Sequence, residues 1–513
     1  MPGICVSVAR TRHKMMIAEY KAAAEQGADL VELRLDYLRR EPDFGRLLRE
    51  RPAPVIATCR RRDEGGRFSG SEEDRKRILR LAIAQGVDYV DLEADIADEI
   101  PRYGKTKRII SYHNFETTPA NLKLVVRHLE SLDPDIIKVV TLATSPKDNV
   151  RVLELIRETK VPTVAFCMGE LGVPSRILCG KWGAPFTYAA FNPQRLLAPG
   201  QLTFRQVRDV YHFHQVTRNS EIYAVIGDPI MHSLSPHVHN AAFRHLGIDA
   251  IYVPFRVTRD QFPTFLEDVE PLKIRGFSVT IPHKESAVTK VEYADGAVRM
   301  VRALNTLVRR DGYWEGHNTD YRAAMMLLES RAAAPAGTRQ PFGGKRALVL
   351  GAGGVARAIV FGLVRRGALV TVCGRTLERA AALAKEAGAR HIPWQQRTGV
   401  PCDILVNCTP IGMFPNVDEC PVPPGYLEER MLVFDTVYHP ENTLLIKEAR
   451  NRGCQVITGL EMFVKQAVLQ FQLFTEQEAP EELMLAVARR ELAMTDTTAA
   501  TAKGQGTSED AVV

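Results

Sequence analysis

The sequence lacks any apolar run long enough to cross a membrane as a helix, and it lacks any long run of basic residues. A membrane-spanning helix needs about 20 consecutive apolar residues, so we predict no membrane partner. The net charge of +6 is spread along the chain. Such diffuse charge does not predict a nucleic-acid partner, and it suits small anionic ligands held in local pockets.

The nine cysteines are scattered from Cys5 to Cys454, and none forms a C-x-x-C pair. This spacing indicates neither a zinc site nor a disulfide framework, so no metal is predicted. Free thiols are the default of a reducing compartment. Because we recognise no signal or transit peptide at the amino terminus, we expect a cytoplasmic protein.

The chain of 513 residues has ordinary globular composition, with 45% hydrophobic and 25% charged residues, and is too long for a single ordinary core. Its first part alternates short β-rich runs with helical runs. The candidate strands are "ICVSVA", "ADLVELRLD", "PVIATCR", "VDYVDLEA", "KRIISYHNF", "DIIKVVTLA", "VPTVAFCMG" and "PFTYAAF". Eight strand–helix units predict a closed (β/α)8 TIM barrel, with a doubly wound open sheet as the alternative.

A polar break, "TRNSE", separates this region from two further α/β blocks. The predicted fold class is therefore α/β, an N-terminal (β/α)8 TIM barrel followed by a two-lobed α/β part with a nucleotide-binding Rossmann lobe. The tail has almost no large apolar residues and is expected to be disordered. The expected boundaries are 1–215 for the barrel, 221–325 and 340–465 for the two lobes, 466–494 for closing helices and 495–513 for the tail.

Lys138 lies in the middle of the apolar strand "DIIKVV". An ammonium in an apolar interior is costly and tends to lose its proton. An edge strand, a side chain that reaches water, or a pairing carboxylate would each explain it structurally.

Polar residues also cluster at the C-terminal ends of the other barrel strands, where barrel enzymes place their catalytic groups. Glu32, Arg34 and Asp36 alternate on one strand and therefore share a face, so they fit either an interior ion network or a site for a polar anion. The other candidates are Arg60, Glu93, His113, Arg176 and Gln201.

The ordered motifs "ELRLD", "TCR", "SYHNF", "DIIKVV", "CMG…SR" and "APGQ" resemble the type I 3-dehydroquinate dehydratases across the whole barrel. The resemblance implies that Lys138 forms a Schiff base with the substrate ketone, its pKa being lowered by an apolar wall. It further implies that His113 carries protons and that Glu93 orients or charge-balances it.

By the same resemblance, Arg176 grips the substrate carboxylate, while Glu32, Arg34, Arg60 and Gln201 hold its hydroxyls or carboxylate. The glycine-rich stretch "EGGRFSGSEEDR" resembles the mobile loop that covers the site in this family. Leu197 stands where many relatives carry serine, so one substrate hydrogen bond is missing from the pattern.

A second motif, "VLGAGGVARAIV", follows a predicted strand and opens a helix. Gly351, Gly353, Gly354 and Ala356 fit the dinucleotide fingerprint, which seats a pyrophosphate on the helix N-terminus. The next strand ends without an acidic residue, and Arg375, Thr376 and Arg379 follow. An arginine there suits a 2′-phosphate and indicates NADP(H); a solvated arginine pair at a helix start is the structural alternative.

The motifs "GDPIMHSLSPHVHNAAF", "SVTIPHKESA", "ALNTLV", "GHNTD", "NCTPIGM", "DTVYHP" and "GLEMFVKQA" resemble the shikimate dehydrogenases over nearly all of 221–495. This resemblance implies that Lys284 and Asp320 form the catalytic pair, since an ammonium beside a carboxylate can protonate an alkoxide. Gly374 stands where many relatives carry asparagine. The implied substrate-binding residues are Ser233, Ser235, Thr280, Asn305, Tyr438 and Gln466.

Together these patterns predict a fused enzyme that dehydrates 3-dehydroquinate to 3-dehydroshikimate and then reduces it to shikimate with NADPH. The expected partners are these small molecules alone, and the oligomeric state is left open. An NAD-dependent quinate/shikimate dehydrogenase fused to the barrel is one alternative, against which Arg375 argues. A quinate-sensing regulatory protein is another, against which the intact Lys138 and Lys284 argue.

Overall fold

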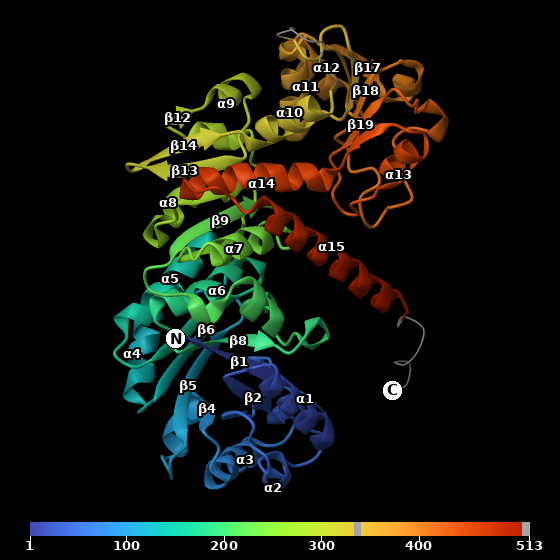
Figure 1. Cartoon of the computed structure of the whole chain (residues 1–513). Coiled ribbons are helices and arrows are strands. Elements are labelled where there is room, and N and C mark those ends of the chain that lie inside the picture. Colours follow the sequence, from blue (N-terminus) through green and yellow to red (C-terminus); the bar gives the residue numbers. More distant parts are fainter. Residues whose placement is uncertain (333–339, 505–513) are drawn as a thin grey trace. The chain divides into compact units, whose positions relative to one another are not determined.

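The computed structural model describes residues 1–332 and 340–504 (Figure 1). It forms two compact units. The first comprises Met1–Pro236 with Gly247–Ile274, and the second comprises His237–Leu246 with the chain from Arg275 onward. The first unit contains the whole of the predicted barrel.

The barrel prediction is confirmed, and each of the eight expected strands is present. They are β1 (Gly3–Val8), β2 (Leu30–Arg34), β3 (Val55–Thr58), β4 (Tyr89–Glu93), β5 (Lys107–Asn114), β6 (Ile136–Leu142), β7 (Thr163–Met168) and β8 (Phe186–Ala190). The sheet runs in the order β7-β6-β5-β4-β3-β2-β1-β8. Because β1 pairs in parallel with both β2 and β8, the sheet curves into a nearly closed barrel and is not doubly wound.

Helices connect these strands along the blue and green part of the chain (Figure 1). They are α1 (His13–Glu25), α2 (Phe44–Leu47), α3 (Glu72–Ala84), α4 (Leu122–Ser131), α5 (Pro146–Glu158) and α6 (Val173–Trp182). Helix α3 begins with a capping box, in which Ser71 and Asp74 satisfy each other's backbone N–H groups. Both faces of the strands are covered, which explains why the strand sequences read as nearly continuous apolar runs.

The first unit also contains β9 (Glu221–Gly227) and β10 (Ala250–Arg256), which pair in parallel, and α8 (Phe262–Asp268). In the second unit, β13 (Thr306–Arg310) pairs antiparallel with both β11 (Gly276–Val279) and β14 (Tyr313–His317). The remaining elements of this block are α7 (Ser235–His245), whose first two residues belong to the first unit, β12 (Tyr293–Ala294), α9 (Gly296–Val301) and α10 (Thr319–Arg331).

The predicted Rossmann lobe is confirmed as a six-stranded parallel sheet in the order β17-β16-β15-β18-β19-β20. From β15 the chain first adds β16 and β17 on one side and then β18, β19 and β20 on the other. Parallel sheets bind dinucleotides in the crevice at such a switch point. The elements are β15 (Arg346–Leu350), α11 (Gly354–Arg365), β16 (Leu369–Gly374), α12 (Leu377–Ala387), β17 (Arg390–Pro393), β18 (Ile404–Asn407), β19 (Leu432–Asp435), α13 (Leu444–Asn451) and β20 (Gln455–Ile457).

Two helices close the chain, α14 (Gly459–Thr475) and α15 (Glu481–Gly504). The expected tail at 495–513 needs a correction, because α15 continues to Gly504. Alanines at 499, 500 and 502 are strong helix formers, and an existing helix extends at little cost. Residues 505–513 lie outside the described residues.

Candidate active sites

A cavity of about 590 Å³, its open mouth included, occurs in the barrel. It is lined by seven of the nine polar candidates that the sequence placed on or after the barrel strands, and Asp36 and Glu93 are the exceptions. The seven are Glu32, Arg34, Arg60, His113, Lys138, Arg176 and Gln201. The expectation that barrel enzymes place catalytic groups at the C-terminal ends of their strands therefore grouped residues that are far apart in the chain but line one cavity.

Lys138 is 6% exposed and points into the barrel from β6. Its Nζ lies 2.9 Å from Asp91 Oδ2 and 3.8 Å from Glu32 Oε1, and 4.3 Å from the centre of the Tyr188 ring. The expected apolar wall around this amine is therefore wrong. Its strand neighbours are apolar, but the amine itself lies close to two carboxylates.

Asp91 is a residue that the sequence analysis missed. Besides Lys138, it accepts hydrogen bonds from Arg60 at 2.6 Å and from Ser111 at 2.7 Å. Burial by itself would raise the pKa of Asp91, but Arg60 and Lys138 hold that pKa far below its usual range. A signal was available, because Asp91 and Glu93 alternate on β4 and therefore face the same side.

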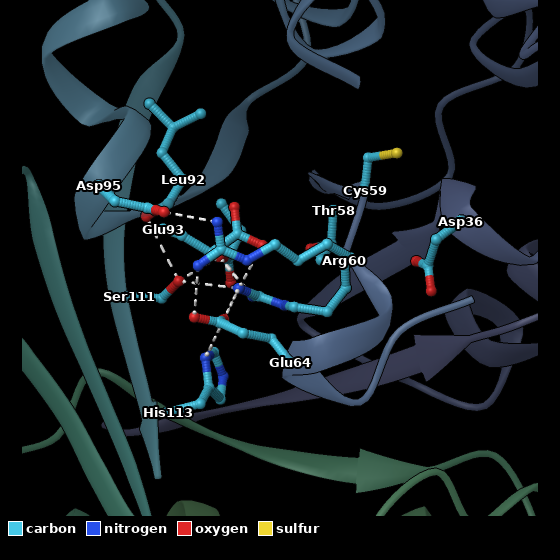
Figure 2. A network of polar contacts seen from close by, with 12 residues as sticks. Asp36, Thr58, Cys59, Arg60, Glu64, Leu92, Glu93, Asp95, Ser111 and His113 are labelled. Atoms are coloured by element: carbon cyan, nitrogen blue, oxygen red, sulfur yellow. Dashed lines mark hydrogen bonds and ion pairs between the residues drawn. The ribbon is translucent and has the colours of Figure 1, made fainter. Parts of the chain in front are cut away.

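His113 is paired with Glu64, not with Glu93. Its Nδ1 lies 3.2 Å from Glu64 Oε2, and Figure 2 shows this carboxylate between His113 and Arg60. Glu93 instead contacts Arg60 at 2.9 Å and Arg75 at 2.6 Å. The expectation that Glu93 orients His113 is therefore wrong. The sequence analysis missed Glu64 because this residue lies between β3 and α3, outside the alternating pattern that identifies inward-facing strand residues.

The imidazole of His113 is held neutral by its surroundings. Burial lowers the pKa of His113 well below its ordinary value, and the positive charges of Arg60 and Lys138 lower it further. A neutral imidazole at pH 7 can accept a proton, so the geometry fits a general base.

Three arginines line the cavity, and two of them are already paired. Arg34 makes a bidentate pair with Asp36 at 2.9 and 2.8 Å. Arg60 is shared by Glu64, Asp91 and Glu93, and Figure 2 shows Glu64 and Glu93 beside it. Both guanidiniums are therefore held mainly in ion pairs within the protein. For Arg34, this is the interior ion network that the sequence analysis gave as one alternative.

Arg176 differs from these two. It is 3% exposed, its guanidinium lies 4.4 Å above the Phe166 ring, and its Nε has no hydrogen-bond partner. Within residues 1–332 and 340–504 no carboxylate pairs with it, and burial lowers its pKa to about 10. A buried, unpaired guanidinium is costly unless it meets an anion, so Arg176 is the group best suited to a substrate carboxylate.

The loop between β3 and α3 contributes Glu64 and Gly65 to the cavity wall. Gly65 has a φ of +72°, and a side chain there would meet Phe115 at 3.1 Å. At Gly66 an added Cβ would approach the Arg60 carbonyl oxygen to 2.0 Å. The two glycines are therefore required for this course of the loop. At the far side, Gln201 Oε1 accepts a hydrogen bond from the Leu197 N–H at 2.8 Å.

The second unit holds the other predicted catalytic pair, because Lys284 Nζ lies 2.6 Å from Asp320 Oδ2. Asp320 belongs to the first turn of α10, where the helix dipole favours a carboxylate. Asn305 Nδ2 donates to Thr319 Oγ1 at 2.8 Å and to Gln466 Oε1 at 3.4 Å.

The remaining substrate-binding candidates have more local contacts. The Tyr438 ring packs 5.3 Å from that of Phe463, whose carbonyl oxygen accepts from Gln466 Nε2. Thr280 follows β11, and its carbonyl oxygen accepts the His283 N–H at 2.9 Å. Ser233 and Ser235 belong to the first unit, and Ser233 Oγ accepts the Ser235 N–H at 3.2 Å.

The nucleotide fingerprint adopts the geometry that its glycines predict. Gly351 has a φ of +115°, and a Cβ there would lie 2.8 Å from the Cys408 carbonyl oxygen, so only glycine fits. At Gly354, the first residue of α11, a Cβ would meet Lys284 Cδ at 3.2 Å. The phosphate-binding end of α11 is therefore next to the candidate catalytic lysine.

Arg375, Thr376 and Arg379 are exposed where β16 ends and α12 begins. In the described part of the chain, neither arginine is paired with a carboxylate. Two unpaired cations beside the fingerprint fit a 2′-phosphate.

Comparison with known proteins agrees with both halves of this description. Residues 4–218 match the type I 3-dehydroquinases, residues 225–307 the shikimate dehydrogenase substrate binding domain, residues 336–409 the shikimate/quinate 5-dehydrogenases and residues 459–489 the shikimate 5′-dehydrogenase C-terminal domain. A chloroplastic bifunctional 3-dehydroquinate dehydratase/shikimate dehydrogenase from Arabidopsis thaliana is 37% identical over 94% of this chain and 83% of its own length. The chain belongs to this bifunctional family.

Relatives of the second half alone are also close. A shikimate dehydrogenase (NADP(+)) from Methanosarcina mazei is 40% identical over 52% of this chain and 96% of its own length. A shikimate dehydrogenase solved in complex with NADP+ is 33% identical, with a TM-score of 0.50, and the match covers 54% of this chain and 97% of that one. As a bifunctional 3-dehydroquinate dehydratase/shikimate dehydrogenase, the chain joins a lyase barrel to an NADP-dependent oxidoreductase. Within the described residues, no helix is long and apolar enough to cross a membrane.

Proposed function

We propose that the barrel dehydrates 3-dehydroquinate through a Schiff base on Lys138, and that the second part reduces the resulting 3-dehydroshikimate to shikimate with NADPH. The observation that carries the first half is the convergence of Lys138, a neutral His113 and an unpaired Arg176 on one cavity. Arg176 holds the substrate carboxylate with charge-assisted hydrogen bonds, and the ring ketone then faces Lys138.

In this mechanism the Lys138 ammonium first gives up a proton, and His113 is the neutral base of the cavity that can accept it. The free amine adds to the ketone carbon, and His113 returns the proton as water is lost, which leaves a protonated imine and a neutral His113. His113 removes a proton from the neighbouring carbon and returns one to the departing hydroxyl, which leaves as water. Hydrolysis of the imine releases 3-dehydroshikimate and restores Lys138. Asp91 balances the cationic nitrogen, and Glu64 orients His113.

In the second half, the bound nicotinamide cofactor supplies the hydride. Lys284 donates a proton to the oxygen of the reduced ketone, and Asp320 holds that lysine in place. Asn305, Gln466, Thr280 and Tyr438 of the second unit hold ring hydroxyls or the carboxylate. Gly351, Gly353, Gly354 and Ala356 allow the pyrophosphate to approach α11. Arg375, Thr376 and Arg379 bind the 2′-phosphate, which favours NADPH over NADH.

Borohydride reduction in the presence of 3-dehydroquinate tests the first half directly. Mass spectrometry is expected to find the reduced adduct on Lys138, and Lys138→Ala is expected to abolish dehydration while shikimate dehydrogenase activity persists. An adduct on another lysine, or none, contradicts the proposed site. Loss of both activities contradicts the separation of the two sites.

We further propose that the dehydratase ends near residue 215 and that the dehydrogenase begins near residue 221. A protein that starts at Ser220 is expected to fold and to reduce 3-dehydroshikimate by itself, which its solubility and activity measure. A cytoplasmic location is likewise a proposal, and the Arabidopsis relative is named as chloroplastic.

A further inference from the structure

Tyr188 carries a hydroxyl that the proposed mechanism does not use. The residue lies on β8, is 5% exposed and lines the barrel cavity. Its Oη is buried and has no hydrogen-bond partner among the described residues. An unpaired buried hydroxyl destabilises a fold, and phenylalanine would fill the same space without that cost. The oxygen therefore calls for an explanation outside the packing of the barrel.

The ring of Tyr188 is fixed by its neighbours. Its centre lies 5.5 Å from that of Phe186 and 6.1 Å from that of Phe166, both in edge-to-face arrangements. The face of the same ring lies 4.3 Å from Lys138 Nζ, and the Phe166 ring carries Arg176 at 4.4 Å. Tyr188 and Phe166 therefore form one aromatic wall between the candidate Schiff-base amine and the unpaired guanidinium.

The acceptors around this wall are already occupied. Glu32 accepts from Ser7 at 2.6 Å and from Thr58 at 2.9 Å, while Asp91 accepts from Arg60, Ser111 and Lys138. Burial raises the pKa of Tyr188 well above its ordinary value, and the negative charge of Glu32 raises it further. The phenol therefore stays protonated at neutral pH and remains a donor without an acceptor in the protein.

We propose that Tyr188 is a substrate-binding residue of the dehydratase, whose hydroxyl donates a hydrogen bond to an oxygen on the substrate ring close to the carbon that Lys138 attacks. The ligand class is a polyhydroxylated cyclic keto acid. Its carboxylate lies at Arg176 and its ketone at Lys138, so its ring hydroxyls face the wall between them. This inference rests on the proposed function of Lys138, and it adds a specificity contact that neither charged group supplies.

Tyr188→Phe isolates this contact, because it removes one oxygen and keeps the ring beside Lys138. Loss of one hydrogen bond between neutral groups is expected to lower kcat/KM for 3-dehydroquinate roughly three- to tenfold, mainly through KM. The shikimate dehydrogenase activity of the same chain is expected to stay unchanged. Without substrate, the variant is expected to unfold at the wild-type temperature or above it, because an unpaired buried hydroxyl has been removed.

Tyr20→Phe is the matched control. The Tyr20 hydroxyl is also buried, but it donates to the Ala53 carbonyl oxygen and lies outside the cavity. Its loss is expected to lower the unfolding temperature and to leave kcat/KM at the wild-type value. A structural hydroxyl and a substrate-binding hydroxyl therefore give opposite patterns in the two measurements.

Two results would overturn the inference. One is a kcat/KM of Tyr188→Phe within twofold of wild type, which would mean that the hydroxyl meets only water. The other is a lower unfolding temperature together with weaker activity, the pattern of a structural residue. Borohydride trapping on Lys138 in wild type and in Tyr188→Phe separates the two proposals. If wild type forms no adduct, the proposed function of Lys138 fails. If both proteins form the adduct and have equal kinetics, only the role of Tyr188 is rejected.

Discussion

Nζ of Lys138 and Oδ2 of Asp91 lie 2.9 Å apart inside the barrel, and both side chains are almost fully buried. The carboxylate also holds Arg60, so one negative charge serves two cations. The proposed catalytic amine is therefore embedded in a charged network that keeps it in position before substrate arrives.

Asp91→Asn is expected to destabilise the barrel by about 3–5 kcal/mol, because removing one partner of a buried pair leaves the other charge uncompensated. Urea unfolding of the full chain measures this loss. The exposed Asp95, which pairs with Arg61, provides the control, and Asp95→Asn should cost less than about 1 kcal/mol. Equal effects of the two substitutions would contradict the assignment of Asp91 to a buried network.

Glu64→Gln is expected to lower the dehydratase kcat by about 10²-fold or more, with little change in KM, since the His113 imidazole loses the carboxylate that orients it. Glu93→Gln should act differently. Because Glu93 contacts two arginines and not His113, its main effect is expected on the free energy of unfolding. Steady-state kinetics and denaturation of both variants test this, and the reverse pattern would restore Glu93 as the orienting residue.

The pH dependence of dehydration follows from the low pKa of His113. Burial, Arg60 and Lys138 all disfavour the imidazolium, so the neutral base persists to a pH well below the usual histidine value of about 6.5. The profile of kcat/KM is therefore expected to show no acid limb near pH 6.5. An acid limb at that pH would mean that His113 is exposed to solvent in the working enzyme.

The free energy of unfolding of the dehydrogenase is expected to depend on pH through Asp435, which lies at the end of β19. Burial raises its pKa to about 6, despite hydrogen bonds from Thr443, Val437 and Asn407, whereas the unfolded chain has a value near 3.9. Between these values the folded state binds more protons, so the free energy of unfolding falls as pH rises from about 4 to about 6. The expected loss is roughly 3 kcal/mol.

Comparing Asp435→Asn with wild type at pH 4, 5, 6 and 7 isolates this contribution, because the other titrating groups cancel in the difference. The wild-type stability should decline relative to the variant as pH rises. A difference that is constant with pH would show that Asp435 titrates at its ordinary value in the folded protein.

Arg375→Ala is expected to raise the KM for NADPH at least about tenfold and the KM for NADH little, because charge-assisted hydrogen bonds contribute roughly 1.5–3 kcal/mol. Arg379 can compensate in part, so the double substitution is the cleaner test. The exposed Arg430, which pairs with Glu428, is the control. Equal losses with both cofactors would mean that Arg375 does not bind the 2′-phosphate.

Much of this architecture could be read from the sequence, because its signals are local. Short apolar runs marked the eight strands, and the polar residues on and after them marked the cavity, including Lys138, His113 and Arg176. The glycine-rich motif predicted a turn between a strand and a helix, and β15 and α11 confirm it. In each case the chemistry of a few adjacent residues determines the structure.

What the sequence did not reveal depends on tertiary packing. Glu64 reaches His113 from outside the strands, and the pairing of Arg60 depends on Asp91 and Glu93 of the neighbouring strand β4. Tyr188 was hidden in a strand that reads as apolar throughout. Asp91 is different, since its alternation with Glu93 was visible and only its partner was unknown.

The position of Glu64 has a consequence for the proposed proton transfer. Glu64 and Gly65 belong to the same short loop, and Gly65 packs against Phe115, a neighbour of His113 on the chain. Any movement that lifts Gly65 from the cavity also takes the carboxylate away from the imidazole. The orientation of the base therefore depends on where this short segment lies, so a substitution in the segment is expected to change proton transfer without altering His113 itself.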